Sequence, residues 1–507
     1  MGKKGFTILG VSVGALIVLA IGGYFLYQNL VNTPKNAYLM AELDNSEDIT
    51  ELVEERFEDE LEWYENSMKN PSETSIGVTA ETNDPSLNDM GLAEIINNAE
   101  INLNASQDIE GEMSTFDLSA NINTLSIEDV NGYITGDKLG LTLPFIEEYL
   151  VVNEEDAPKL LHETNPENFE GDEEIDFSTF FQSSSLTEEE RDYFVDEYSK
   201  YMQENLPDEA FESAKEEVKV GENTVDAEKL TMTLTEEQMH EFLKGLFNKM
   251  AEDEKLVNLV NAQLLSANFG MPAGQEEDLE ASEMFKQAAN EVEDLEFPNG
   301  LSSVVWQDGE GNIVKRDFDV SVVTEGETTD IALDTTNEVR ENGNLITSTL
   351  TGNGEEEVVF VFDLNEVENG YEDTFTVNAA GEEQIKLVST KSDEDENTVW
   401  NLEAAINQGA TSDQPLKLFM ESSTNYASDQ ASGDIQLYAE DGQTITKDTA
   451  VINVTHESST ISEVEIPSSD NEKDLGKMSK EELEAYFTDE VQPKFEEWAR
   501  ENFGGSF

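Results

Sequence analysis

Acidic side chains set the strongest limit on how this chain can fold. The 507 residues include 113 Asp and Glu against 28 Lys and Arg, which gives a net charge of −85 at pH 7. So many like charges repel one another in a compact state, and they must lie on the surface in contact with solvent. Salt shortens the reach of this repulsion, from about 10 Å at 0.1 M to about 3 Å at 1 M. The composition therefore indicates adaptation to high salt, with an ordinary acidic surface protein as the alternative.

The same charge excludes several classes of partner. Nucleic-acid binding depends on clustered Lys and Arg, and an anionic membrane surface would repel so acidic a protein. Hydrophobic residues make up 37% of the chain, which is enough to build cores. The chain has no cysteine, so it can form no disulfide, cysteine metal site or thiol nucleophile. We therefore expect no nucleic-acid partner and a stability that depends on packing.

An uncharged segment near the N-terminus predicts a membrane anchor. The run from Phe6 to Tyr27 would span about 33 Å as a helix, and a bilayer hydrocarbon core is about 30 Å thick. Lys3 and Lys4 precede it and favour a cytoplasmic N-terminus. We thus expect a cytoplasmic tail at 1–5, an anchor in the lipid bilayer of the cell membrane at 6–27, and the remaining chain outside the cytoplasm.

Two further interpretations of this segment follow from its small residues. Ala20 and Gly22 form a small-x-small triplet that would permit cleavage after Gly22, as in a signal peptide. The apolar run is longer than the usual signal-peptide core, which favours an uncleaved anchor. Gly10 and Gly14 have the spacing of a helix dimerisation face, so a weak homodimer is a second expectation.

Beyond the anchor, hydrophobic periodicity predicts alternating helical and β regions. Capping boxes at Thr235/Gln238 and Ser479/Glu482 mark two helix starts. The predicted regions are a helix plus antiparallel sheet domain at 34–160, a mainly helical middle at 185–295 with a β-hairpin at 218–234, an antiparallel β domain at 300–458 and a C-terminal helix at 479–503. The predicted fold class is α+β: an N-terminal transmembrane helix, then antiparallel sheet domains with packed amphipathic helices.

Three sequence stretches carry a resemblance to a known family. They are "PKNAYLMAE" from Pro34, "DKLGLTLPFIEEYLVVN" from Asp137 and "GENTVDAEKLTMTLTEEQMHEFL" from Gly221. Together with the N-terminal segment, they resemble a family of uncharacterised membrane-anchored extracytoplasmic proteins of Gram-positive bacilli, whose function is unknown. The layout also resembles the lipoprotein-carrier fold, in which an antiparallel half-barrel wraps a helix. That resemblance implies an apolar cavity for lipid-like ligands, although this chain lacks the cysteine of the lipid-modified versions.

Apolar residues at alternate positions of 116–150 suggest a ligand-binding face. If the sheet is curved, this face could hold an apolar ligand such as a lipid, or a peptide; a filled core is the plain alternative. The predicted face consists of Phe116, Leu118, Leu139, Leu141, Phe145 and Leu150. The resulting hypothesis is a membrane-anchored binding or structural protein without enzymatic activity.

Motifs for catalysis or for cofactor and metal binding are absent from the sequence. His162, His240 and His456 form no metal-binding spacing, and no phosphate-binding loop or nucleophile elbow occurs. The stretch "KSDEDEN" starts like a calcium loop, but Thr398 stands where glycine is required and Ala404 where an acid is required. We therefore expect no cofactor and no metal. The alternative function is an extracytoplasmic cell-wall hydrolase whose catalytic carboxylates are hidden among the many acids.

Overall fold

The computed structural model describes residues 33–123, 125–166, 169, 171, 175–181, 188–268, 281–324, 326–354, 356–394, 396–409, 414–467 and 471–503. The predicted anchor at 6–27, with Gly10 and Gly14, lies outside these residues. The chain forms two compact units from interleaved segments. Unit 1 comprises Met1–Arg56, Ser183–Leu265 and Glu276–Thr390, and unit 2 comprises Phe57–Gln182, Ser266–Gln275 and Lys391–Phe507.

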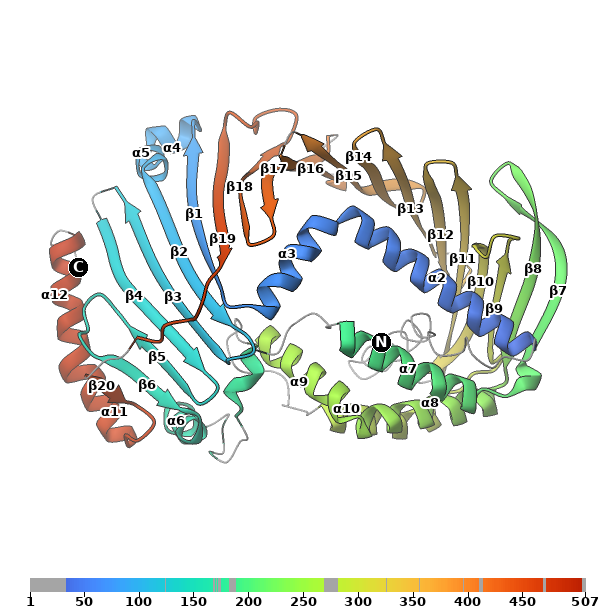
Figure 1. The fold of residues 1–507 in the computed structure, drawn as a ribbon, viewed down its shortest axis with the longest axis horizontal. Helices are drawn as coiled ribbons and strands as arrows, with labels where there is room; N and C mark the ends of the chain where they lie inside the picture. The colour runs from blue at the N-terminus through green and yellow to red at the C-terminus, as the bar shows by residue number, and fades with distance from the viewer. Residues whose placement is uncertain are drawn as a thin grey trace. The chain divides into compact units, whose positions relative to one another are not determined.

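Unit 1 is built on consecutive antiparallel strands that pair in sequence order from β7 to β14. Figure 1 shows these strands side by side, coloured from green to brown. They are β7 (Phe211–Val220), β8 (Asn223–Leu234), β9 (Leu301–Gln307), β10 (Ile313–Thr324), β11 (Glu327–Arg340), β12 (Gly343–Gly352), β13 (Glu356–Val367) and β14 (Gly370–Ala379). β15 (Glu382–Glu394) carries the chain onward into unit 2.

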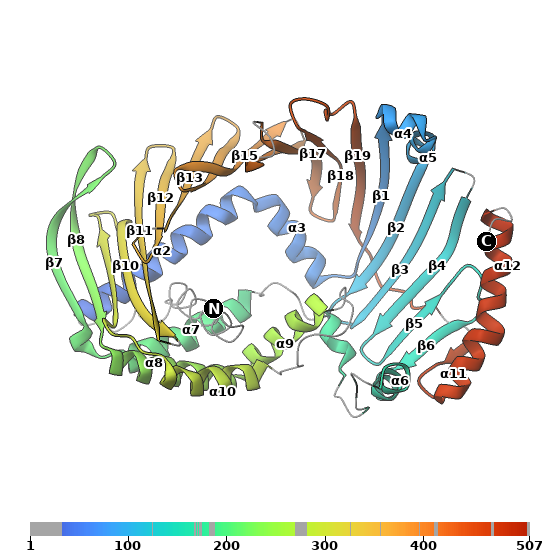
Figure 2. The same ribbon diagram turned by 180° about the vertical axis from the view of Figure 1, so that it is seen from behind.

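Helices cover one face of these strands and enclose the main core of unit 1. α2 (Pro34–Arg56) contacts β7, β8 and β10, and α8 (Glu236–Glu252) packs against α10 (Ala281–Glu291), as Figure 2 shows from behind. The other helices here are α7 (Glu188–Asn205) and α9 (Glu254–Asn268). The core includes the buried apolar stripe of α8, which consists of Met239, Phe242, Leu243, Leu246, Phe247 and Met250.

Unit 2 is a second antiparallel array, in which strands from opposite ends of the chain meet. β1 pairs with β2 on one side and with β19 on the other, so residues 72–82 lie beside residues 450–460. The strands, in spatial order, are β16 (Asn397–Ile406), β17 (Leu416–Ala427), β18 (Gln430–Glu440), β19 (Ala450–Thr460), β1 (Ser72–Thr82), β2 (Ala99–Asp108), β3 (Met113–Ile122), β4 (Leu125–Thr135), β5 (Lys138–Thr142), β6 (Tyr149–Asn153) and β20 (Glu472–Asp474).

Short helices complete unit 2. Glu60 of α3 forms an ion pair with Lys391, and Asp59 accepts a hydrogen bond from Thr398. A π-helical segment at Phe487–Val491 joins α11 to α12, just before Pro493. The helices are α3 (Glu58–Lys69), α4 (Pro85–Asp89), α5 (Leu92–Asn97), α6 (Ala157–Thr164), α11 (Lys480–Tyr486) and α12 (Gln492–Phe503).

The predicted α+β class with an N-terminal transmembrane helix is wrong. Twenty strands dominate the described chain, and β6–β20 is parallel whereas the other pairings given above are antiparallel. The hairpin at 218–234, expected inside a helical middle, forms the end of β7 and the whole of β8, and β8 pairs with β9 of unit 1. Among the described residues, no helix combines the length and apolar character that a membrane span requires.

Candidate functional site

A polar face in unit 2 is formed by six adjacent strands, β2, β1, β19, β18, β17 and β16. Alternate residues of a strand point to the same side of the sheet, so the register decides which side chains become neighbours. One row across this face runs through Asn102, Gly77, Thr455, Asp434 and Ser423. A second row, two residues along each strand, runs through Ser75, Glu457, Ser432 and Asn425. We call these two rows the polar face.

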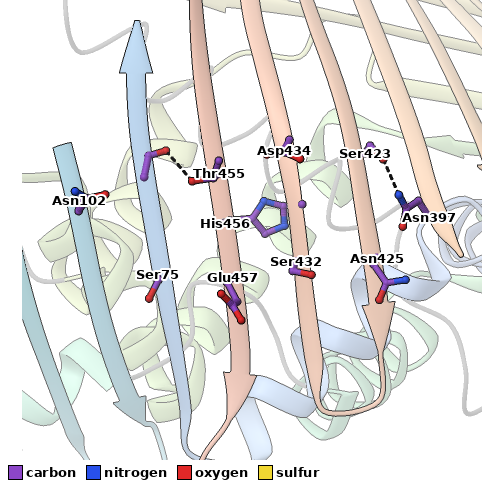
Figure 3. A pocket seen from close by; sticks show the side chains of 12 residues that line it. Ser75, Asn102, Asn397, Ser423, Asn425, Ser432, Asp434, Thr455, His456 and Glu457 are labelled. Atoms are coloured by element: carbon purple, nitrogen blue, oxygen red, sulfur yellow. Dashed lines mark hydrogen bonds between the residues drawn. The ribbon is translucent and has the colours of Figure 1, made fainter. Parts of the chain in front are cut away.

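An open hollow of about 510 Å³ lies on the polar face. Figure 3 shows its lining side chains, which come from all six strands. The lining residues are Ser75, Gly77, Asn102, Asn397, Ser423, Asn425, Ser432, Gly433, Asp434, Thr455, His456 and Glu457. A second hollow of about 650 Å³ shares Asn397 and Ser423 with the first and adds Glu394, Glu396 and Val399. Small-molecule sites have volumes of about 300–1,000 Å³, so the first hollow has the size of a ligand site.

Hydrogen bonds within the face fix some of the lining side chains and leave others available. Asn397 Nδ2 donates to Ser423 Oγ at 3.1 Å, and Asn425 Nδ2 donates to a backbone carbonyl of the same unit at 2.5 Å. Within the described chain, the Ser432 hydroxyl and the Asp434 carboxylate make no hydrogen bond to protein. Free donors and acceptors of this kind can bind the hydroxyl or amide groups of a ligand.

The charged residues that line the hollow are all acidic. The lining residues include Asp434 and Glu457 but no Lys or Arg. Burial lowers the pKa of His456, while the nearby Asp434 carboxylate works to raise it. Its Nδ1 is shielded from solvent and has no hydrogen-bond partner in the described structure. Because a neutral imidazole adds no positive charge, the hollow suits a neutral or cationic ligand and disfavours an anionic one.

Two glycines keep the strands close together around the hollow. A Cβ at Gly77 would approach Thr455 Oγ1 to 2.7 Å and Asn102 Oδ1 to 3.3 Å, so a side chain there would project between its cross-strand neighbours. A Cβ at Gly433 would lie 2.8 Å from Thr424 Cα and would clash with the Ser423 carbonyl oxygen. Backbone atoms held in a strand ladder cannot move aside without losing hydrogen bonds.

We therefore expect Gly433→Ala to destabilise unit 2. The clash is with backbone, so the cost should be that of overpacking, about 1–3 kcal/mol. Urea denaturation followed by far-UV circular dichroism, which reports the strands of both units, measures it. The matched control is Gly352→Ala, a strand glycine of unit 1 whose added Cβ meets nothing within 4 Å. Equal and small effects of the two substitutions on the free energy of unfolding would refute the close packing at Gly433.

The predicted apolar face maps onto β3–β6. Phe116 lies opposite Gly132, Gly132 opposite Leu141, and Leu141 opposite Leu150, which places three of the six residues in one cross-strand row. The Phe116 ring covers Gly132, where a Cβ would clash with it. Leu118 is the second residue along β3 from Phe116, and Leu139 the second along β5 from Leu141, so both share the face.

Aromatic side chains of the C-terminal helices pack near the end of this row. The ring of Phe145 lies 5.3 Å from that of Phe495 and 5.8 Å from that of Trp498. Leu150 is buried in a cluster with Ile146 and Tyr486. Neighbouring side chains of the same unit therefore occupy this part of the predicted ligand face.

An apolar cavity lies elsewhere, inside unit 1, and it is small. Its volume is about 80 Å³, well below the roughly 300 Å³ at which ligand pockets begin. Its lining residues are Tyr38, Leu39, Glu42, Met202, Leu206, Met232, Leu234, Met239, Phe242, Leu243, Leu301, Ser303, Arg316 and Phe318. A cavity of this size has no room for a lipid chain.

Metal-binding geometry does not occur in the described part of the chain, where no group of three or more His, Asp or Glu side chains is placed to hold an ion. His240 Nε2 lies 2.8 Å from the Leu295 carbonyl oxygen, so this histidine has a structural hydrogen bond. Asp308 accepts hydrogen bonds from the backbone N–H groups of Glu310 and Asn312, as a turn residue does.

Comparisons with known proteins identify no family. No family model matches the chain, and no curated protein matches it. Among solved structures, OprB of Pseudomonas putida is 8% identical with a TM-score of 0.24 and covers 78% of this chain and 95% of its own. OccK5 (OpdH) of Pseudomonas aeruginosa is 6% identical with a TM-score of 0.24, covering 77% and 97%. A mutant of Rh. blastica porin is 7% identical with a TM-score of 0.22, covering 77% and 99%.

These findings contradict several predictions from the sequence. The solved structures that resemble the chain include a porin, Rh. blastica porin. The predicted membrane-anchored acidic surface protein holding an apolar ligand or peptide, its cell-wall hydrolase alternative and the single-pass location in the cell membrane are withdrawn. The small volume of the apolar cavity gives an independent physical reason to abandon the apolar ligand. At TM-scores of 0.22–0.24, the likeness itself assigns this chain no activity.

Sequence reasoning missed the polar face altogether. Its residues occupy the outward positions of ordinary alternating strands, and such positions are polar in any half-exposed sheet. The available signal was the kind of polar residue: short Ser, Asn and Thr side chains and no Lys or Arg at the outward positions of 423–434, 455 and 457.

Proposed function

We propose that unit 2 has a non-catalytic role in recognising a neutral, hydroxyl-rich ligand of the glycan class at the hollow on the polar face. The observation that carries this proposal is the lining itself. It offers Ser, Thr, Asn, Asp and Glu side chains from six neighbouring strands within about 510 Å³. Sugar hydroxyls both donate and accept hydrogen bonds, so they match a mixture of amide, hydroxyl and carboxylate groups.

The charge of the lining residues and of the whole chain narrows the class of ligand that the hollow can bind. With no Lys or Arg among the lining residues, and a net charge of −85 on the chain, a sulfated or phosphorylated ligand would be repelled. The lining residues include no aromatic ring other than the imidazole of His456, so stacking contributes little. Affinity then rests on hydrogen bonds, each worth about 0.5–1.5 kcal/mol net, which favours a weak, rapidly exchanging ligand.

Isothermal titration calorimetry of the full chain with a neutral oligosaccharide, at high protein concentration, tests the proposal. Ser423→Leu fills the centre of the site, because Ser423 lines both hollows, and it should weaken binding at least about 10-fold through steric exclusion and lost hydrogen bonds. The matched control is Asn401→Leu, which changes an exposed residue of β16 that lies outside both hollows and on the same side as Asn397. Absence of heat with any neutral oligosaccharide, or equal weakening by both substitutions, would overturn the proposal.

A further inference from the structure

Two carboxyl groups face each other across β10 and β11 in unit 1. Asp317 and Asp334 are directly opposite in the antiparallel register, and Asp317 Oδ1 is shielded from solvent and has no hydrogen-bond donor in the described structure. A hydrogen bond between two carboxyl groups requires a proton on one of them, because an ionised carboxylate only accepts. Like charges directly opposite in a strand pair are otherwise destabilising.

Of the two carboxyl oxygens of Asp317, one has a donor from a lysine and the other can be satisfied only by a proton on Asp334. Lys315 Nζ donates to Asp317 Oδ2 at 2.8 Å, whereas Asp317 Oδ1 is shielded from solvent and, within the described chain, receives no donor. If Asp334 carries the proton, its O–H can donate to Asp317 Oδ1 and satisfy it. If both groups are ionised, a buried acceptor is left without a donor and faces a second negative charge.

The neighbouring strands supply little to compensate this charge. On β10, Lys315 is the nearby cation and Asp319 adds a negative charge. On β9, Val304 lies opposite Asp317, and Trp306 stacks under the ammonium of Lys315 at 4.4 Å. The ammonium of Lys229 on β8 lies 5.2 Å from the same ring.

β12 completes the surroundings on the far side of the pair, where Thr349 lies opposite Asp334 and brings no charge. Burial, then the neighbouring Asp317 carboxyl, raise the pKa of Asp334 above its ordinary value of 3.8.

We propose that Asp317 and Asp334 hold one proton between them in acid, and that its loss as pH rises weakens the pairing of β10 with β11. This makes the strand pair a pH-sensitive element in unit 1, independent of the hollow in unit 2. For an acid whose pKa is raised on folding, the stabilisation is fully present below the unfolded value of about 3.8. It is lost as pH rises through the higher folded pKa.

Thermal unfolding of the full chain between pH 3.5 and pH 8, followed by Trp306 fluorescence, tests the proposal. The background carries Phe in place of Trp63, Trp400 and Trp498, so that the signal comes from unit 1. Asp334→Asn cannot ionise and keeps an N–H donor for Asp317. Its unfolding temperature should exceed that of the unsubstituted background by about 2–4 °C at pH 8, and the difference should vanish toward pH 3.5.

Two further variants make the result decisive. Asp319→Asn removes a negative charge from the same face of β10 without touching the pair, and its effect should be smaller and nearly independent of pH. Asp334→Thr, which suits a strand and offers a hydroxyl donor, should reproduce the effect of Asp334→Asn if that variant fails to fold. A pH-independent difference for both Asp334 variants, or an equal rise for Asp319→Asn, would overturn the proposal.

Discussion

Glu42→Leu should lower the free energy of unfolding of unit 1 by about 3–5 kcal/mol. Glu42 on α2 and Arg316 on β10 form a bidentate ion pair, with Nη1 donating to Oε1 at 2.6 Å and Nη2 donating to Oε2. The two side chains are only 10% and 19% exposed. Removing the carboxylate leaves a guanidinium in the wall of an apolar cavity without its partner, and this uncompensated charge accounts for the size of the effect.

A double variant separates the pair's net contribution from the cost of breaking it. Glu42→Leu combined with Arg316→Met replaces both charges by apolar groups, and such replacements are often neutral or stabilising. We expect the double variant to recover most of the loss. The control is Glu283→Gln, which breaks the exposed pair with Lys286 on α10 and should cost less than about 0.5 kcal/mol. Urea denaturation followed by Trp306 fluorescence, in the background with Phe in place of Trp63, Trp400 and Trp498, gives all three values. A single variant no worse than the control would contradict the buried pair.

Phe247→Ala should be comparably damaging, at about 3–5 kcal/mol, for a different reason. Phe247 is 1% exposed and is among the largest fully buried side chains of the described structure. It belongs to the stripe of α8 that packs in the main core of unit 1, together with Leu243 and Leu246. Truncation removes the transfer free energy of the ring and leaves a cavity that the surrounding strands and helices fill only partly.

The same fluorescence measurement checks this value. Ile49→Ala is the matched control, because Ile49 lies on α2 in the same unit and is 54% exposed. It should change the free energy of unfolding by less than about 0.5 kcal/mol, since alanine also has the higher helix propensity. A loss below about 1.5 kcal/mol for Phe247→Ala would place α8 outside the core.

Local sequence patterns predicted many individual elements correctly. The capping boxes at Thr235/Gln238 and Ser479/Glu482 are both formed, and each begins the predicted helix. These features depend on neighbours within a few residues, and a sequence displays such neighbours directly.

Long-range pairing could not be predicted in this way. β1 pairs with β19 across more than 360 residues, and no pattern within either strand specifies the other as its partner. The helical part of the predicted 34–160 domain is divided at Phe57, where α2 ends and α3 begins. At Phe57 the chain passes from unit 1, where Arg56 binds Asp373, to unit 2, where the Phe57 ring packs on Trp400.

The candidate site could not be predicted from the sequence for the same reason. Ser75 lies on β1 and Ser432 on β18, and both reach the hollow only because β19 pairs with both of those strands. The predicted apolar face, in contrast, comes from β3, β5, β6 and the loop between β5 and β6, where short connections make the pairing local. The sequence therefore predicted a face in β3–β6, where strands that are close in the sequence pair with one another.

Saturation-transfer NMR on the full chain tests the central claim about the polar face most directly. Neutral and sulfated forms of one oligosaccharide are compared at 0.1 M and 1 M NaCl. We predict magnetisation transfer to the neutral form at both salt concentrations, because its binding rests on hydrogen bonds, and its loss in Ser423→Leu but not in Asn401→Leu. Transfer confined to the sulfated form, or none to the neutral form at either salt concentration, would contradict the claim.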